Sequence, residues 1–188
     1  LPVVIALLAL SACSAGGRIV NALQPDEGIV AKHGVAYGSL PRQKYDLYAP
    51  LEAKPGDPVI VFVYGGSWHS GSRKDYAFVG EALARRGFIT AIADYRLYPK
   101  VVFPAFVEDE AKAVSAISRD VGADHPLFVM GHSAGAQIAA LLVLDPHYLK
   151  AEGIDVCRRV SGFIGLAGTY STLPLRKEKY RKIFPEDV

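Results

Sequence analysis

Four short apolar runs constrain the fold of this chain more than any other feature. They are rich in β-branched and aromatic residues and cover residues 59–64, 88–93, 127–130 and 162–166. The unbroken run over residues 59–64 predicts a strand that is buried on both faces of a sheet, and residues 127–130 predict another buried strand. Residues 88–93 and 162–166 predict two further strands. Helical periodicity between them predicts helices over residues 75–86, 107–117 and 134–144. Strands that alternate with helices indicate an α/β fold with a mostly parallel, doubly wound sheet and right-handed crossovers.

The composition is that of one globular domain. The chain has 188 residues, of which 51% are hydrophobic and 21% are charged, so it can bury a core. Its 21 basic and 19 acidic residues leave a net charge of +2, which predicts no nucleic-acid partner. The two cysteines support neither a disulfide framework nor a zinc site. No metal and no cofactor is predicted.

The beginning of the chain is an apolar run, residues 1–10, followed by Ser11, Ala12 and Cys13. This segment resembles the lipobox of bacterial lipoproteins, in which a signal peptide is cut before a cysteine that carries lipid. We therefore expect residues 1–12 to be a partial signal peptide, Cys13 to be lipidated and residues 13–30 to be a tether. The expected location is an exported, membrane-anchored lipoprotein or the periplasm of a bacterium. An ordinary secretory signal and an N-terminal strand are the alternatives.

A candidate nucleophile lies between the third apolar run and the third predicted helix. The segment Gly131-His132-Ser133-Ala134-Gly135 has the pattern G-x-S-x-G in its strand-turn-helix context. This pattern places a serine on a sharp turn, where small residues two positions away let strand and helix approach closely. The alternative is a turn in which Ser133 only caps the helix. His132 is interpreted as a packing residue.

A second glycine-rich segment, Tyr64-Gly65-Gly66-Ser67-Trp68, follows the first apolar run. Together with the serine motif, it resembles the α/β-hydrolase carboxylesterases with an HGG-type oxyanion motif, near the hormone-sensitive-lipase and kynurenine-formamidase groups. Further stretches carry the resemblance, namely residues 45–48 with Pro50, residues 94–97 with Pro99, and residues 103–105 leading to Asp109. The resemblance implies an α/β-hydrolase domain over residues 31–188.

The resemblance also implies roles for individual residues. Ser133 would be the nucleophile, and the backbone N–H groups of Gly66, Ser67 and Ala134 would form the oxyanion hole. Trp68 and His69 are candidates for the substrate pocket, with packing and a surface position as their respective alternatives. The sequence departs from the family at Tyr64, where a histidine is usual, and at Ser67, where many members have a third glycine. Neither change removes a backbone N–H group.

The residues that should activate the serine are absent from the sequence. The nearest downstream histidine, His147, lies beyond a helix of about ten residues, which is about 15 Å. His125 precedes the nucleophile strand, at its opposite end, and Asp94 and Asp109 are interpreted as structural. Similar enzymes carry the triad acid and histidine after two further strands. We therefore expect a fragment that is truncated after the strand over residues 162–166, is largely inactive by itself and leaves that strand exposed at the sheet edge.

The function predicted from these motifs is a serine carboxylesterase that cleaves small-molecule esters through an acyl-enzyme on Ser133. A peptidase or formamidase on the same scaffold would use the same residues and differ only in its leaving group. A non-catalytic lipoprotein that uses the fold as a binding module is the alternative from another class. The fold by itself does not choose among them.

Overall fold

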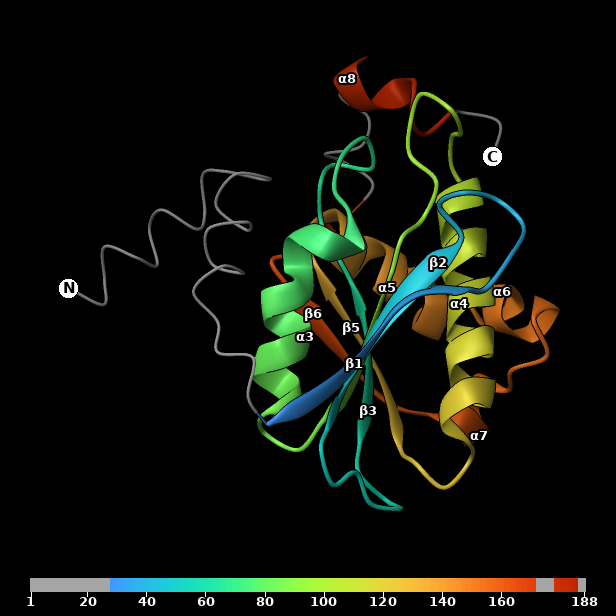
Figure 1. The fold of residues 1–188 in the computed structure, drawn as a ribbon. Helices are drawn as coiled ribbons and strands as arrows, with labels where there is room; N and C mark the ends of the chain where they lie inside the picture. Colours follow the sequence, from blue (N-terminus) through green and yellow to red (C-terminus); the bar gives the residue numbers. More distant parts are fainter. Residues whose placement is uncertain (1–27, 172–177, 186–188) are drawn as a thin grey trace.

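The protein is organised around a six-stranded sheet, as a computed structural model of residues 28–171 and 178–185 shows (Figure 1). The strand order is β1-β2-β4-β3-β5-β6. The strands are β1 (Ile29–Ala36), β2 (Lys44–Pro50), β3 (Val59–Val63), β4 (Ile89–Ala93), β5 (Leu127–His132) and β6 (Val160–Leu166). Cys13 and the rest of the predicted signal peptide lie outside the described residues.

The sheet is parallel from β4 to β6 and antiparallel at β1 and β2. Every residue of β3 and β4 is buried, which is why their sequences are unbroken apolar runs. The predicted α/β class and the mostly parallel sheet are confirmed. The polar and apolar alternation at residues 44–48 belongs to β2, which pairs antiparallel with both β1 and β4 and is therefore an inner strand of the sheet.

Helices cover both faces of the sheet (Figure 1). The short helix α3 (Ala77–Ala84) packs on β2 and β4, whereas α4 (Ala105–Val121) and α5 (Ala134–Leu144) lie together on the opposite face. Sequence periodicity predicted these helices, although the first one begins as a 3-10 turn, η1 (Arg73–Tyr76), because Ser72 caps that turn. The other helices are α6 (Pro146–Ala151), α7 (Val156–Arg159) and α8 (Glu178–Arg181).

The last strand, β6, pairs with β5 and forms an edge of the described sheet, as predicted. Two of its apolar side chains are exposed, Ile164 at 39% and Leu166 at 42%, whereas β3 and β4 in the centre are fully covered. None of the helices within residues 28–171 and 178–185 is long and apolar enough to cross a membrane.

One acid of the core, Glu110, has no neutralising partner among the residues that the structure describes. Glu110, on α4, is completely buried, and neither of its carboxyl oxygens has a hydrogen-bond partner among the described residues. Burial, followed by the charges of Asp109 and Asp94, raises the pKa of Glu110 well above its ordinary value. The folded protein therefore holds Glu110 protonated at a pH where the unfolded chain has it ionised, so its contribution to stability falls as the pH rises above the ordinary pKa.

We expect Glu110→Met to raise the free energy of unfolding by about 1–3 kcal/mol at pH 7.5, because it removes an unsatisfied buried polar group. The gain should shrink towards pH 4, where Glu110 is protonated in both states. Urea unfolding at several pH values measures both effects. The control is Glu108→Met on the same helix, where the side chain is exposed and no such gain is expected. A Glu110→Met protein that is less stable at pH 7.5 would contradict the prediction.

Candidate active site

Ser133 occupies a sharp turn between β5 and α5. Its φ of 54° and ψ of −120° lie in a region that a residue with a Cβ atom rarely adopts. Such a conformation costs about 1–3 kcal/mol and persists only where the surroundings impose it. Here its N–H donates to the Leu166 carbonyl at 2.8 Å, and its carbonyl accepts from the Ala136 N–H at 3.0 Å. The hydrogen bonds therefore hold the serine between the edge strand and the first turn of α5.

The two glycines of the motif are sterically required. A Cβ atom on Gly131 would lie 2.3 Å from the carbonyl oxygen of Gly135, so strand and helix touch at this point. A Cβ atom on Gly135 would lie 2.2 Å from the carbonyl oxygen of Val63 and 2.4 Å from that of Tyr64. The spacing of small residues around Ser133 therefore reflects contacts of backbone with backbone, both within the turn and between α5 and β3.

The paired-glycine segment lies directly beside this turn. β3 runs parallel to β5, with Val63 opposite Gly131, so both strands end at the same edge of the sheet. A Cβ atom on Gly65 would be 3.0 Å from the Cβ atom of Ser133 and 2.9 Å from the carbonyl oxygen of His132. The backbone of the loop can approach the serine this closely because Gly65 has no side chain.

The backbone of the loop after Gly65 is unusual at three successive residues. Gly66 has a φ of 138°, and Ser67 and Trp68 have φ values of 51° and 61°. The carbonyl oxygen of Gly66 accepts from the N–H groups of His69 at 3.2 Å and Ser70 at 3.1 Å, which closes the loop. Within the described part of the chain, the N–H groups of Gly66, Ser67 and Ala134 have no acceptor. These amides are the donors expected of the oxyanion hole, and they remain available to a ligand.

The two pocket candidates have different environments. Trp68 is 3% exposed, donates from Nε1 to Oε1 of Gln137 at 3.2 Å, and packs edge-on against Phe184 with ring centroids 4.8 Å apart. It is therefore part of the core beneath the loop, in agreement with the packing alternative. His69 is exposed at the surface.

Tyr64, at the position where a histidine is usual, anchors the strand that leads into the loop. Its hydroxyl donates to Oδ1 of Asp94 at 3.0 Å and accepts from Nη2 of Arg42 at 2.7 Å. Its ring stacks on Tyr95, with centroids 4.7 Å apart. Burial raises the pKa of Tyr64 well above its ordinary value, so the hydroxyl stays protonated and keeps donating to Asp94.

Two arginines that the sequence analysis did not single out complete this support. Arg42 also donates to the Gly71 carbonyl at 2.9 Å, where the loop ends. Arg73 forms ion pairs with both Asp94 and Asp46, and its N–H donates to Oδ1 of Asp94 at 2.7 Å. Asp94 therefore acts as a structural acid, as we interpreted it. No local sequence signal marks the arginines, because arginine is usually a surface residue, and Arg42 lies in a turn and Arg73 begins the short helix η1.

Asp109 is structural as well. Its carboxylate accepts from Nε2 of Gln43 at 2.9 Å and from the backbone N–H of Arg96 at 2.9 Å, and it is 2% exposed. The Arg96 guanidinium pairs with it at 2.7 Å. These bonds hold the segment after β4 to α4, and they leave Asp109 with no role at Ser133.

No described histidine is hydrogen-bonded to the Ser133 hydroxyl. His147 pairs with Asp145 at 2.6 Å, and His125 contacts the carbonyl oxygen of Asp57 at 2.8 Å. His132 is half-buried, burial lowers its pKa, and its Nδ1 atom has no partner among the described residues. The described residues also contain no group of three or more histidine, cysteine, aspartate or glutamate side chains that could hold a metal ion.

A serine on a strained strand-to-helix turn, beside a paired-glycine loop at the carboxyl edge of a mostly parallel sheet, defines an α/β-hydrolase. Comparison with known proteins agrees with this class. The model of the BD-FAE family matches residues 45–155, and the chain belongs to that family.

The relatives that this chain resembles are named as esterases and formamidases. The chain is 35% identical over 162 residues to the probable isoprenylcysteine alpha-carbonyl methylesterase ICME of Oryza sativa subsp. japonica, covering 80% of this chain and 39% of that protein. It is 34% identical to esterase LipC of Mycobacterium tuberculosis, over 75% of this chain and 37% of LipC. Kynurenine formamidase of Danio rerio is 27% identical, over 75% of this chain and 47% of the enzyme. The chain thus spans less than half the length of these relatives.

Solved structures give the same fold. A candidate thioesterase from Silicibacter superposes with a TM-score of 0.72 at 26% identity, covering 89% of this chain and 59% of that structure. A bacterial heroin esterase superposes with a TM-score of 0.63 at 25% identity, covering 79% of this chain and 47% of the esterase.

The comparisons overturn the localisation that we expected from residues 1–13. The methylesterases are plant proteins and the formamidases are fish proteins, and these relatives are not exported bacterial lipoproteins. The prediction of a lipid-anchored or periplasmic bacterial protein is therefore wrong. It relied on a short apolar segment followed by a cysteine, a pattern that is too simple to indicate export by itself.

Proposed function

We propose that the whole protein is a serine hydrolase that cleaves carboxylic esters through an acyl-enzyme on Ser133. The observation that carries the proposal is the conformation of Ser133, held at a φ of 54° within contact distance of Gly65. A strained residue of this kind is kept where it serves a function. The names of most of the relatives describe ester hydrolysis, which supports the same reaction.

The proposed reaction follows from the groups around the turn. The Ser133 hydroxyl oxygen attacks the carbonyl carbon of a small-molecule ester, while a general base takes the hydroxyl proton. The negative oxygen of the tetrahedral intermediate accepts hydrogen bonds from the N–H groups of Gly66, Ser67 and Ala134. Collapse of the intermediate breaks the bond to the alkoxy oxygen, which leaves as the alcohol after receiving the proton. Water then attacks the acyl-enzyme and releases the carboxylic acid.

This mechanism requires a base within hydrogen-bond reach of the Ser133 hydroxyl. Among the described histidines, His125 and His147 are hydrogen-bonded to other groups, and the remaining ones apart from His132 are exposed. His132 lies next to the serine on the turn, but it forms no hydrogen bond to the Ser133 hydroxyl. The proposal is therefore made for the whole protein, and its activity must be tested there.

Hydrolysis of a formamide is a second candidate function. It is favoured by the likeness to kynurenine formamidase, which is 27% identical over 75% of this chain. The nucleophile and the oxyanion donors would be the same, and only the leaving group would change from an alcohol to an amine. The rates at which the whole protein hydrolyses an aryl ester and the formamide of the matching aniline distinguish the two candidate functions. Faster hydrolysis of the ester favours the esterase, and faster hydrolysis of the formamide favours the formamidase.

A fluorophosphonate probe tests the nucleophile directly. We expect the whole protein to form one covalent adduct, with the phosphonyl group on the peptide that contains Ser133, because the probe mimics the tetrahedral intermediate at an activated serine. Digestion and tandem mass spectrometry locate the adduct, and heat-denatured protein is the control. An adduct at another serine would reassign the nucleophile. A folded protein that forms no adduct would favour the non-catalytic binding module.

A further inference from the structure

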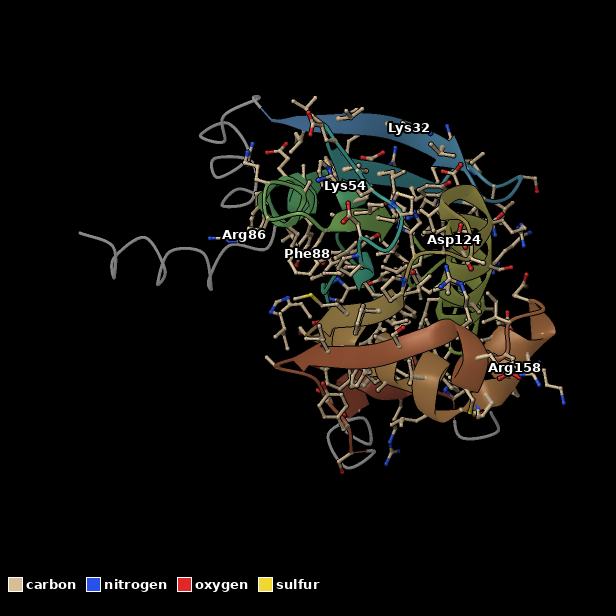
Figure 2. The ribbon with its side chains drawn as sticks, turned by 90° about the horizontal axis from the view of Figure 1, so that it is seen from below. Lys32, Lys54, Arg86, Phe88, Asp124 and Arg158 are labelled. Carbon is tan, nitrogen blue, oxygen red and sulfur yellow. The ribbon has the colours of Figure 1, made fainter. Side chains whose placement is uncertain are left out.

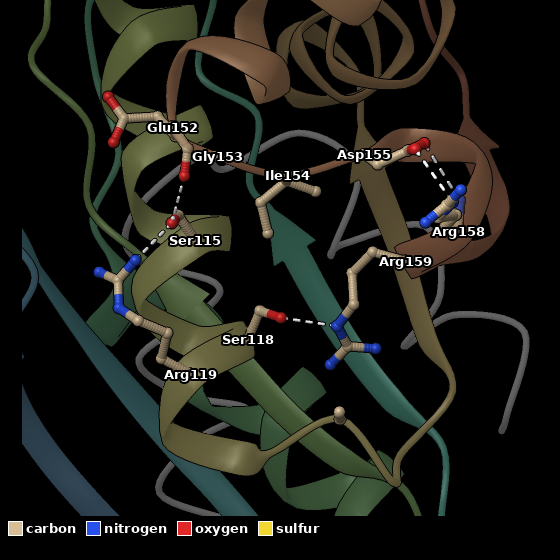
Figure 3. A pocket seen from close by; sticks show the side chains of 10 residues that line it. Ser115, Ser118, Arg119, Glu152, Gly153, Ile154, Asp155, Arg158 and Arg159 are labelled. Carbon is tan, nitrogen blue, oxygen red and sulfur yellow. Dashed lines mark hydrogen bonds and ion pairs between the residues drawn. The ribbon is translucent and has the colours of Figure 1, made fainter.

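A pocket lies at the end of the molecule opposite to Ser133. It has a volume of about 540 Å³ and lies between the last turns of α4 and the segment that joins α6 to α7 (Figure 3). Its polar side chains are two serines, three arginines and two acids, namely Ser115, Ser118, Arg119, Arg158, Arg159, Glu152 and Asp155. Ser133 follows the carboxyl end of β5, whereas this pocket lies near the amino end of β6, about 20 Å away by the length of a six-residue strand.

The guanidinium groups of the pocket outnumber their carboxylate partners. Arg158 faces Asp155 at 3.5 Å, and both side chains are exposed, at 88% and 58%. Arg119 donates to the Ser115 hydroxyl at 2.6 Å and has no carboxylate partner among the described residues. Glu152 also lines the pocket, but Figure 3 marks no ion pair between its carboxylate and Arg119. The pocket therefore has positive charge that the described chain does not neutralise.

Arg159 is held at the floor of this pocket by neutral groups only. It donates from Nε to the Ser118 hydroxyl at 2.6 Å, from Nη1 to the His125 carbonyl at 2.8 Å and from Nη2 to the Gly122 carbonyl at 3.1 Å. These contacts orient the guanidinium, but they leave its charge without an ionised partner. Burial of the Arg159 guanidinium lowers its pKa, because a charged group is less stable when it is partly removed from water.

We propose that this pocket binds the phosphate group of a small molecule. Guanidinium groups match phosphate oxygens in shape and charge, and they bind them with short, charge-assisted hydrogen bonds. The Ser118 hydroxyl accepts from Arg159, so its own proton is available to a phosphate oxygen. Ile154 also lines the pocket and supplies an apolar surface for the organic part of the ligand.

Inorganic phosphate is the probe for this site. We expect phosphate to raise the melting temperature of the whole protein more than chloride at equal ionic strength, because a ligand of the folded state stabilises it. Isothermal titration calorimetry then gives the dissociation constant. Arg119→Gln should weaken phosphate binding about tenfold, by loss of one charge-assisted contact. Arg119 is exposed, so this variant should fold.

The matched control is Arg86→Gln, which removes the same charge from an exposed arginine at the opposite side of the molecule from Arg158 (Figure 2). It should leave phosphate binding unchanged, and so should Ser133→Ala, which separates this site from the proposed active site. If Arg119→Gln does not fold, Arg158→Gln replaces it, with an expected loss of at least threefold. Equal phosphate binding by the pocket and control variants, or no binding by the unaltered protein, would overturn the proposal.

Discussion

Ser133→Ala should lower kcat for ester hydrolysis by the whole protein by about 10⁴- to 10⁶-fold, the range seen when a serine hydrolase loses its nucleophile. The side chain lost is the only one that the proposed mechanism uses to form a covalent bond. The backbone amides of the oxyanion hole would remain, so a small residual rate above the uncatalysed reaction is expected. Initial rates with a chromogenic short-chain ester, corrected for spontaneous hydrolysis, measure the difference.

Ser67→Ala is the matched control. It removes a hydroxyl from the neighbouring loop but keeps the backbone N–H group that the proposal assigns to the oxyanion hole. We expect its kcat to fall less than about tenfold, because one neutral hydrogen bond is worth about 1 kcal/mol. If Ser133→Ala retained most of the activity, the nucleophile would have to be another residue. If both serine variants lost activity equally, the loop hydroxyl would have a chemical role that the present mechanism lacks.

Gly135→Ala should destabilise the protein by about 3 kcal/mol or more, since overpacking a rigid site costs about 1–3 kcal/mol and sometimes more. Helix propensity alone predicts the opposite sign, because alanine is favoured over glycine inside a helix by about 1 kcal/mol. The added methyl group would lie 2.2 Å from the Val63 carbonyl oxygen and 2.4 Å from that of Tyr64. Both obstacles are backbone atoms, so α5 or β3 must move, and the loop would then shift relative to Ser133.

Urea unfolding and the rate of fluorophosphonate labelling measure the two consequences separately. The matched control is Gly87→Ala, at a position with a φ of 90° and open space around the missing side chain. Its backbone strain alone should cost about 1–2 kcal/mol, with labelling unchanged. A Gly135→Ala protein as stable as the unaltered one, or one that labels at the normal rate, would show that helix and strand can separate without disturbing the site.

A strand or helix was predictable where the pattern of its buried residues can be seen in its own short stretch of sequence. Two apolar runs became β3 and β4, because a strand covered on both faces needs apolar side chains at every position. A third became β5, in which every second residue is buried. β1 gave no such signal, since most of its eight residues are exposed. The short helices α6 and α7 were missed because each depends on one capping aspartate, Asp145 or Asp155, rather than on a periodic pattern.

The sequence by itself determined the turn that carries Ser133. The small residues two positions away are needed for contacts of the local backbone, so the motif and its neighbouring strand and helix indicate that geometry directly. The role of the paired glycines can be predicted from the sequence as well, because a residue without a side chain allows the backbone to approach a neighbouring group closely.

Only the tertiary structure decided how that site is supported. Tyr64 is hydrogen-bonded to Asp94, which lies 30 positions away in the sequence, and Trp68 is hydrogen-bonded to Gln137, which lies 69 positions away. Arg73 pairs with Asp46 on β2 and with Asp94 directly after β4. The strand order places these partners together, and strand order is a property of long-range packing. A side chain's role in such a contact depends on neighbours that no local pattern of residues specifies.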